Sequence, residues 1–139
     1  MPSSRILLFL AAALSFSAPL VARADDAGDI QAVISAQLNA FKAGDGAAAY
    51  SYAAPGIKAM FPSPDSFMAM VRGGYAVVAD ARNVTFGPLQ AEGGGFRQDV
   101  NMTDAKGQSY IASYTLSRQP DGSLKITSCR IRKGEDVSA

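Results

Sequence analysis

Residues 109–132, SYIASYTLSRQPDGSLKITSCRIR, contain two runs of alternating side chains joined by a turn. A period of two sends successive side chains to opposite faces of a β-strand. The apolar face of the first run, which we expect to be buried, carries Tyr110, Ala112, Tyr114 and Leu116. Pro120 fixes its own φ and is followed by Asp-Gly, so residues 119–122 predict the turn of an antiparallel hairpin.

The second run changes parity along its length. Its first half places Leu124 and Ile126 on one face, and its second half places Cys129 and Ile131 on the other. Either an extra residue near Thr127-Ser128 forms a β-bulge, or the strand is buried on both faces at one end. Both explanations fit the pattern.

Two more strands are predicted upstream of this hairpin. The first alternates from about residue 83 until Pro88 interrupts it, since proline cannot donate to a sheet. The second, residues 96–103, places Val100 and Met102 on one face and Asp99 on the other. Turn-forming residues at 92–95 and 104–107 separate the strands. Four antiparallel strands are therefore expected in the second half of the chain.

The segment before these strands has the period of helices. The first helix follows Asp29, ends near Gly44 and carries an apolar stripe of Ile30, Val33, Ile34, Leu38 and Phe41. Gln37 falls among its polar remaining positions. A second, short helix over residues 47–52 follows the cap residue Asp45 and ends at Pro55-Gly56.

A third helix has a complete start signal. Ser63 is placed to cap it, Pro64 suits the first helical position and Gly73-Gly74 ends it. Three helices followed by four strands predict an α+β domain in which the helices pack on one face of a curved antiparallel sheet. Such a sheet often leaves a cavity at its open end.

The first 24 residues predict a cleavable secretory signal peptide. Arg5 precedes an apolar run over residues 6–20, and Ala22-Arg23-Ala24 has the small-residue pattern of a cleavage site. A membrane anchor is the competing interpretation, but a spanning helix needs roughly 20 apolar residues. We therefore expect a single domain over residues 25–139 in the periplasm or outside the cell, with no stable membrane anchor after cleavage.

Charge argues against several classes of partner. The 13 basic residues less Arg5 and Arg23 leave 11 against 12 acidic residues, so the mature chain is nearly neutral. A protein without a broad positive field is poorly suited to nucleic acid, and we expect no nucleic-acid partner. The paired acidic residues Asp25-Asp26 and Glu135-Asp136 lie at the chain ends, so we expect no metal site and no cofactor.

Two further residue types limit the chemistry. The chain has no histidine, which removes the central residue of serine and cysteine triads, most zinc sites and the usual general bases. Cys129 is the single cysteine, so no intrachain disulfide is available, and we interpret it as a buried or half-buried structural thiol. Stability must come from packing.

Several sequence blocks across the mature chain carry a family resemblance. In the first half they are residues 30–41, 49–55, 60–61, 63–64, 67–72 and 74–75; in the second half they are residues 114–116 and 119–123 with Ile126 and Cys129. With these blocks the chain resembles the bacterial domain-of-unknown-function 4864 family, although Leu124 stands where we expect Trp in that family. The resemblance implies an exported protein with a cystatin-like or nuclear-transport-factor-2-like cone architecture. It implies no established activity and no catalytic residues.

The expected function is a non-catalytic module that binds a small ligand or another protein. The candidate lining of its cavity is Tyr50, Phe67, Met70, Arg72, Tyr75, Tyr110 and Tyr114. Arg72 has two interpretations, because it either holds an anionic ligand group or only satisfies the last turn of its helix. One alternative is an enzyme that pairs Tyr110 or Tyr114 with Asp99. Another is a structural subunit that forms a homodimer through the outer sheet face.

Overall fold

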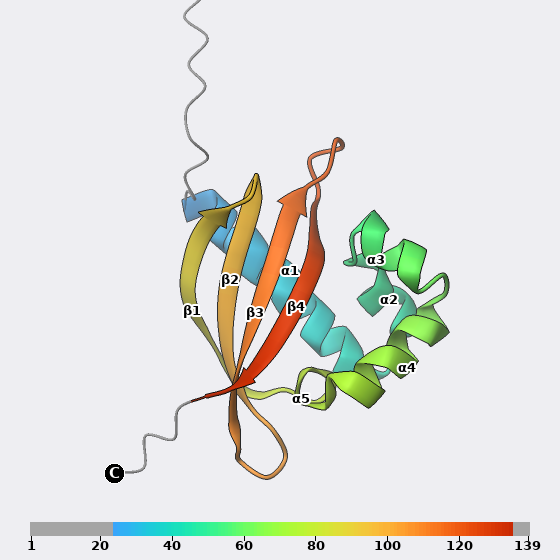
Figure 1. Cartoon of the computed structure of the whole chain (residues 1–139), viewed down its shortest axis with the longest axis vertical. Helices are drawn as coiled ribbons and strands as arrows, with labels where there is room; N and C mark the ends of the chain where they lie inside the picture. Colours follow the sequence, from blue (N-terminus) through green and yellow to red (C-terminus); the bar gives the residue numbers. More distant parts are fainter. Residues whose placement is uncertain (1–23, 135–139) are drawn as a thin grey trace, which may run out of the picture.

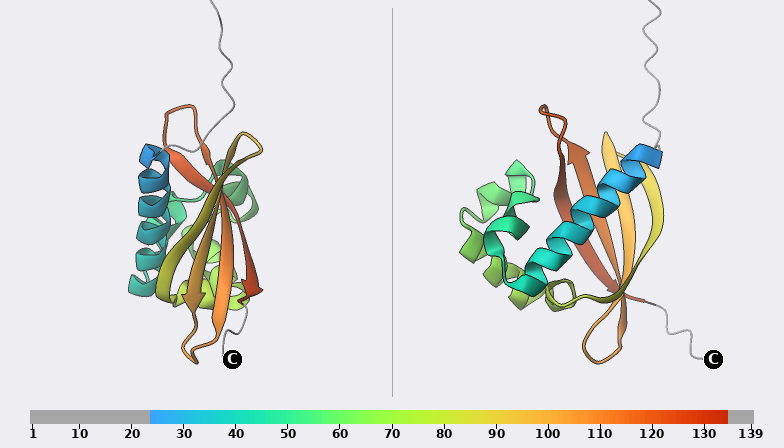
Figure 2. Two further views of the ribbon diagram at one scale, coloured as in Figure 1. Left: turned by 90° about the vertical axis from the view of Figure 1, so that its left-hand side faces the viewer. Right: turned by 180° about the vertical axis from the view of Figure 1, so that it is seen from behind.

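A four-stranded antiparallel sheet with the order β1-β2-β3-β4 forms one layer of the computed structural model, which describes residues 24–134. The strands are β1 (Arg82–Glu92), β2 (Gly95–Thr103), β3 (Ser109–Arg118) and β4 (Leu124–Lys133). Helix α1 (Ala24–Ala43) crosses one face of this sheet diagonally (Figures 1 and 2). The predicted α+β class is confirmed. Residues 1–23 of the predicted signal peptide lie outside the described residues.

The apolar stripe of α1 lies against the sheet as the sequence predicts. Ile30 and Ile34 are fully buried, and Leu38 and Phe41 are nearly so. The helix begins at Ala24, before Asp29. It ends at Ala43, and Gly44 follows with a φ of 69°, the left-handed conformation that favours glycine. Figure 2 shows α1 on one side of the sheet only, so the sheet has an inner face against α1 and an outer face.

Four shorter helices gather beside the β4 edge of the sheet (Figure 1). They are α2 (Gly46–Ser51), α3 (Pro55–Met60), α4 (Pro64–Gly74) and α5 (Ala76–Ala79). The prediction of three helices is therefore wrong in number, because α3 and α5 were not expected. Pro55 begins α3 rather than only ending α2, since proline at the first helical position loses no hydrogen bond. None of the helices in the described part of the chain is long and apolar enough to cross a membrane.

The caps of α2 and α4 are those that the sequence predicts. Asp45 accepts a hydrogen bond from the Ala48 backbone N–H at 3.1 Å. Ser63 and Ser66 form a reciprocal capping box at the start of α4, with Pro64 at its first position. These local bonds fix where each helix begins, and α4 thereby presents Phe67 and Val71 to the interior.

Two strands depart from regular alternation. β1 continues through Pro88 instead of ending there, because β1 is an edge strand and its register shifts between Phe86 and Leu89. Gln98 on β2 is fully buried and holds this irregular segment by donating from Nε2 to the Gly87 carbonyl at 2.9 Å. The expected end of β1 at Pro88 was therefore wrong.

The irregularity in β4 is the bulge that was one of the two predicted explanations. Thr115 on β3 pairs with Ser128, while the next residue, Leu116, pairs with Ile126. Thr127 is the extra residue, and the strand regains its alternation beyond it with reversed parity. Cys129 and Ile131 therefore face the same side as Ile126.

Connections between distant parts of the chain close the fold. Ala53 and Ile126 form a parallel bridge, which attaches the segment between α2 and α3 to the edge of β4. At the other end Arg118 donates to Asp26 at 3.0 Å and to Asp29 at 3.2 Å, which ties the start of α1 to the β3–β4 hairpin. The bridge thus holds the start of the short-helix segment beside β4.

Candidate functional site

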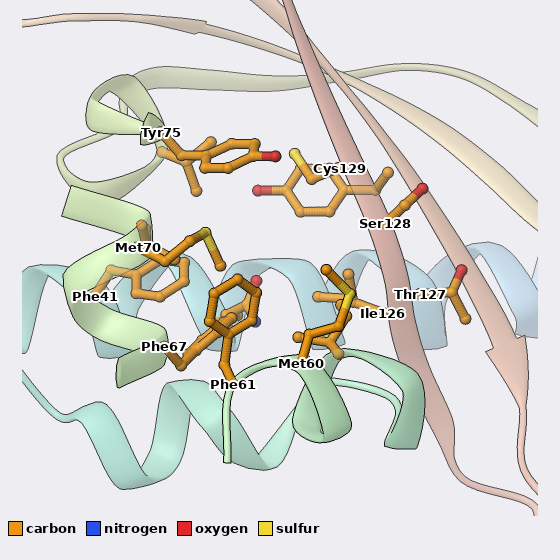
Figure 3. Close-up of a pocket in the computed structure, with 15 residues that line it drawn as sticks. Phe41, Met60, Phe61, Phe67, Met70, Tyr75, Ile126, Thr127, Ser128 and Cys129 are labelled. Atoms are coloured by element: carbon orange, nitrogen blue, oxygen red, sulfur yellow. The ribbon is translucent and has the colours of Figure 1, made fainter. Parts of the chain in front are cut away.

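A cavity of about 290 Å³ lies between the short helices, α1 and the inner face of β4 (Figure 3). Its size is close to the lower limit of about 300 Å³ for small-molecule pockets. The side chains that line it come from α1, α3, α4, α5, β3 and β4: Gln37, Phe41, Ile57, Met60, Phe61, Phe67, Met70, Val71, Tyr75, Val78, Tyr114, Ile126, Thr127, Ser128 and Cys129. Most of them are apolar.

The mouth of the cavity is formed by α3 and the residue that follows it. Met60 lines the cavity and is 72% exposed, the one large apolar side chain so exposed among residues 24–134. Phe61 is held in place by Tyr50, whose hydroxyl donates to the Phe61 carbonyl at 2.6 Å. The Lys58 ammonium lies 5.1 Å from the centre of the Tyr50 ring. Tyr50 therefore holds the backbone of Phe61 at the mouth of the cavity.

The β4 bulge brings Cys129 to the cavity. Regular alternation from Ile126 would turn the thiol to the outer face, and the bulge at Thr127 turns it inward instead. Burial raises the pKa of Cys129 to about 12, although the neighbouring Tyr114 hydroxyl acts in the opposite direction. The thiol is therefore protonated at neutral pH and is not an activated nucleophile.

Tyr114 on the central strand β3 is the most enclosed polar residue of the cavity. It is 1% exposed, and its hydroxyl has no hydrogen-bond partner of ordinary geometry among the described residues. Burial first, and the neighbouring Cys129 second, raise the pKa of Tyr114 well above its ordinary value. The phenol is thus a neutral group with an unused O–H donor in the cavity wall.

Two more neutral polar groups contribute to the lining. Gln37 of α1 is 4% exposed, and its Nε2 donates to the Ala49 carbonyl at 3.1 Å. Tyr75, between α4 and α5, points its hydroxyl across the cavity toward Cys129 (Figure 3). None of the residues that line the cavity in the described part of the chain carries a charge. Within residues 24–134, no three Cys, Asp or Glu side chains gather where they could hold a metal ion.

Comparison with known families assigns the chain. The family model described as "Domain of unknown function (DUF4864)" matches residues 23–139, which include every helix and strand described above. The chain belongs to this family. No curated protein and no solved structure matches this DUF4864 chain.

The candidate residues of this DUF4864 protein are distributed over four places. The four that line the cavity are Phe67, Met70, Tyr75 and Tyr114. Tyr50 packs behind the wall with its ring centre 5.6 Å from that of Phe67. Arg72 is exposed in the last turn of α4, and Tyr110 lines two other pockets elsewhere on the molecule.

Other lining residues were not among the candidates. Gln37 had been assigned to the polar face of its helix, but α2 packs there and buries it. Ile57 lies in α3, which was not predicted, and Phe61 is the residue that follows this helix. The signal that would have found them was Pro55 followed by apolar residues, because proline is favoured at the first position of a helix.

The alternative catalytic pair is not brought together. Asp99 lies on the outer face, where it accepts from Ser113 Oγ at 2.7 Å and faces the Arg132 guanidinium at 3.7 Å. Tyr114 lies on the inner face of the adjacent strand. The sheet of this DUF4864 protein therefore separates the Asp99 carboxylate from the Tyr114 phenol.

Proposed function

We propose that this DUF4864 protein binds a small, uncharged and largely apolar molecule in the cavity between the short helices and β4. The observation that carries the proposal is the lining itself, which is predominantly apolar, contains neutral polar groups and has no charged side chain. A ligand that enters removes apolar surface from water on both sides, at roughly 25 cal/mol per Å². The neutral polar groups then supply orientation.

The exposed rim supports the same proposal. Met60 is flexible and polarizable, so it adapts to ligands of different outline as it lies at the mouth. Phe61 and Ile57 extend the apolar wall toward solvent. A ligand held below α3 would stabilise the folded state by mass action, so it would raise the melting temperature.

Export is part of the proposal. The basic start, apolar centre and Ala-x-Ala end of residues 1–24 support secretion to the periplasm or beyond. Expression of the full chain in a bacterial host and mass determination of the product would test it. The proposal expects a chain that begins at Asp25, and a periplasmic product that retains Met1 would refute it.

Binding is tested first with naphthalene, an uncharged bicyclic probe, by ligand-observed NMR on the purified mature chain. Met70→Trp should fill the cavity and abolish the signal, because Met70 lines it. Ala69→Trp, one residue earlier on the exposed face of α4, is the matched control and should leave binding unchanged. The chain has no native tryptophan, so the fluorescence of each variant reports its own site. Equal binding to both variants would refute the cavity as the site.

Self-association is the second candidate, and one observation favours it. Within the described residues no helix covers the outer face of the sheet (Figure 2). Its side chains include Asp99, Ser113 and Arg132, which bond to one another within the chain. Native mass spectrometry of protein purified from its own host would count subunits and retained ligand together. A dimer without ligand would favour assembly, and a bare monomer would argue against both functions.

A further inference from the structure

The unused hydroxyl of Tyr114 indicates what the ligand presents to the cavity. We infer that the molecule bound there carries an uncharged acceptor oxygen, a ketone or other carbonyl, that accepts a hydrogen bond from Tyr114. The inference rests on the proposed function, because it assigns the chemistry of the same cavity. It starts from a buried polar atom that lacks a partner among the described residues.

A buried hydroxyl without a partner is unusual. The great majority of buried polar side-chain atoms in proteins have at least one hydrogen-bond partner. Tyr114 lies at the centre of β3, paired with Gln98 on one side and Cys129 on the other, so its backbone cannot shift to find one. Its polar neighbour, the Cys129 thiol, is only a weak acceptor. A ligand oxygen would supply the missing acceptor.

The Tyr114 hydroxyl acts at this site as a hydrogen-bond donor. Burial holds the phenol in its neutral form, so the O–H is retained at physiological pH. Tyr75 directs a second hydroxyl toward the same end of the cavity, where Cys129 lies (Figure 3). A carbonyl oxygen has two lone pairs and accepts from two donors at once. The arrangement therefore suits a carbonyl better than a hydrocarbon end.

The absence of charge in the lining distinguishes a carbonyl from a carboxylate. An ionised carboxylate would lose its hydration without meeting a lysine or arginine, because the residues that line the cavity are all neutral. Arg72 is the one charged residue among the candidates, and it is exposed and lies outside the lining. The acceptor should therefore be uncharged.

The experiment compares three probes of nearly equal shape on the purified mature chain. They are methyl naphthyl ketone, isopropenylnaphthalene, in which C=CH₂ replaces C=O, and naphthoate. The ketone should bind roughly three- to tenfold more tightly than the alkene, which corresponds to one net hydrogen bond. Tyr114→Phe should abolish that preference while alkene binding persists, and Tyr52→Phe, a tyrosine outside the lining, should preserve it.

A second measurement does not depend on a variant that folds. The infrared carbonyl stretch of the ketone bound to the native chain should lie at lower frequency than in an alkane solvent. Equal affinities for ketone and alkene, an unshifted stretch, or tighter binding of naphthoate would overturn the inference and leave the cavity as a site. Failure of all three probes to bind would refute the proposed function and the inference with it.

Discussion

Two tyrosines whose hydroxyl groups differ in hydrogen bonding show how individual residues set the properties of this domain. The Tyr50 hydroxyl donates to the Phe61 carbonyl at 2.6 Å, whereas the Tyr114 hydroxyl is buried without a partner among the described residues. A satisfied hydroxyl stabilises the fold, and a buried unsatisfied one costs free energy. One residue supports the cavity, and the other is available to a ligand.

Removal of each hydroxyl should have opposite effects on stability. Tyr50→Phe should lower the free energy of unfolding by about 1 kcal/mol, because it removes the hydrogen bond to the Phe61 carbonyl. Tyr114→Phe should leave it unchanged or raise it by about 1 kcal/mol, because it removes a desolvated group. Urea denaturation of the ligand-free chain measures both. A loss of stability in Tyr114→Phe equal to that in Tyr50→Phe would show that this hydroxyl has a structural partner.

Cys129 should make stability depend on pH in the alkaline range. The ordinary pKa of the thiol is 9.0, and burial raises the pKa of Cys129 to about 12. Between these values the unfolded chain has released a proton that the folded chain still holds, so the free energy of unfolding falls as pH rises above 9. The free energy of unfolding of Cys129→Ala should fall less steeply over this pH interval. Denaturation midpoints of the two proteins at several pH values measure the difference, and parallel profiles would contradict the burial of the thiol.

Some lining residues follow from sequence and others do not. Phe67 lies on the apolar face of a helix whose start signal is complete, so its burial could be predicted from spacing. Gln37 could not, because an amide within an amphipathic pattern indicates the solvent side until a second helix is known to pack there. The inward direction of Cys129 depends on one inserted residue in β4, which alternation alone allows but does not require.

The β4 bulge is the element on which the cavity depends most directly. It lets the strand present Ile126 and Cys129 to the same side although their sequence positions have opposite parity. At the other edge of the sheet, a register shift in β1 accommodates Pro88. Both irregular strands are edge strands, which tolerate such departures because one side of their backbone is not paired within the sheet.

Deletion of Thr127 should test the bulge. The deletion removes the one unpaired residue, so β4 should alternate regularly with Ile126 still opposite Leu116 and Cys129 still opposite Tyr114. The inner face keeps its residues, so the deletion variant should still fold and bind naphthalene. Thr127→Ala keeps the residue count and is the matched control, for which we expect a change within about 1 kcal/mol, as is usual for exposed positions. Urea denaturation compares the two, and a deletion variant that fails to fold beside a folded control would show that the domain needs the bulge itself.

Element boundaries were predictable where local chemistry marks them. The capping box at Ser63 and the turn at residues 119–122 are formed from neighbouring residues, and both are confirmed. Helix α3 escaped prediction because Pro55-Gly56 is typical both of a helix end and of a helix start. Its place is settled by tertiary contact, since the bridge between Ala53 and Ile126 anchors the segment that precedes it.

At the scale of the whole molecule, stability depends on a single shared core. Leu38 is 4% exposed beneath the sheet, whereas its neighbour Asn39 is exposed. Leu38→Asp should unfold the domain, because an unpaired buried charge costs several kcal/mol and total stability is about 5–15 kcal/mol. Asn39→Asp should melt like the parent chain. Circular dichroism distinguishes the two outcomes, and an intact melting transition for Leu38→Asp would contradict the observed core.

The order of elements explains why the fold class was easier to predict than the site. The sheet is a meander of sequential neighbours, so strand periodicity and turn residues were enough to predict it. The cavity instead lies where α3, α4 and α5 meet β3 and β4, and its shape depends on how those elements are spaced. Spacing of this kind is set by packing, which the sequence pattern alone does not report.

The ion pairs of Arg118 with Asp26 and Asp29 join the start of α1 to the β3–β4 hairpin, the last hairpin of the described chain. During synthesis, α1 therefore emerges with Ile30 and Ile34 uncovered, because the strands that will shelter them have yet to be translated. The nascent polypeptide should stay open until β4 is complete. A chain released before β4 is complete would expose the apolar stripe of α1. Holdase chaperones recognise surfaces of this kind.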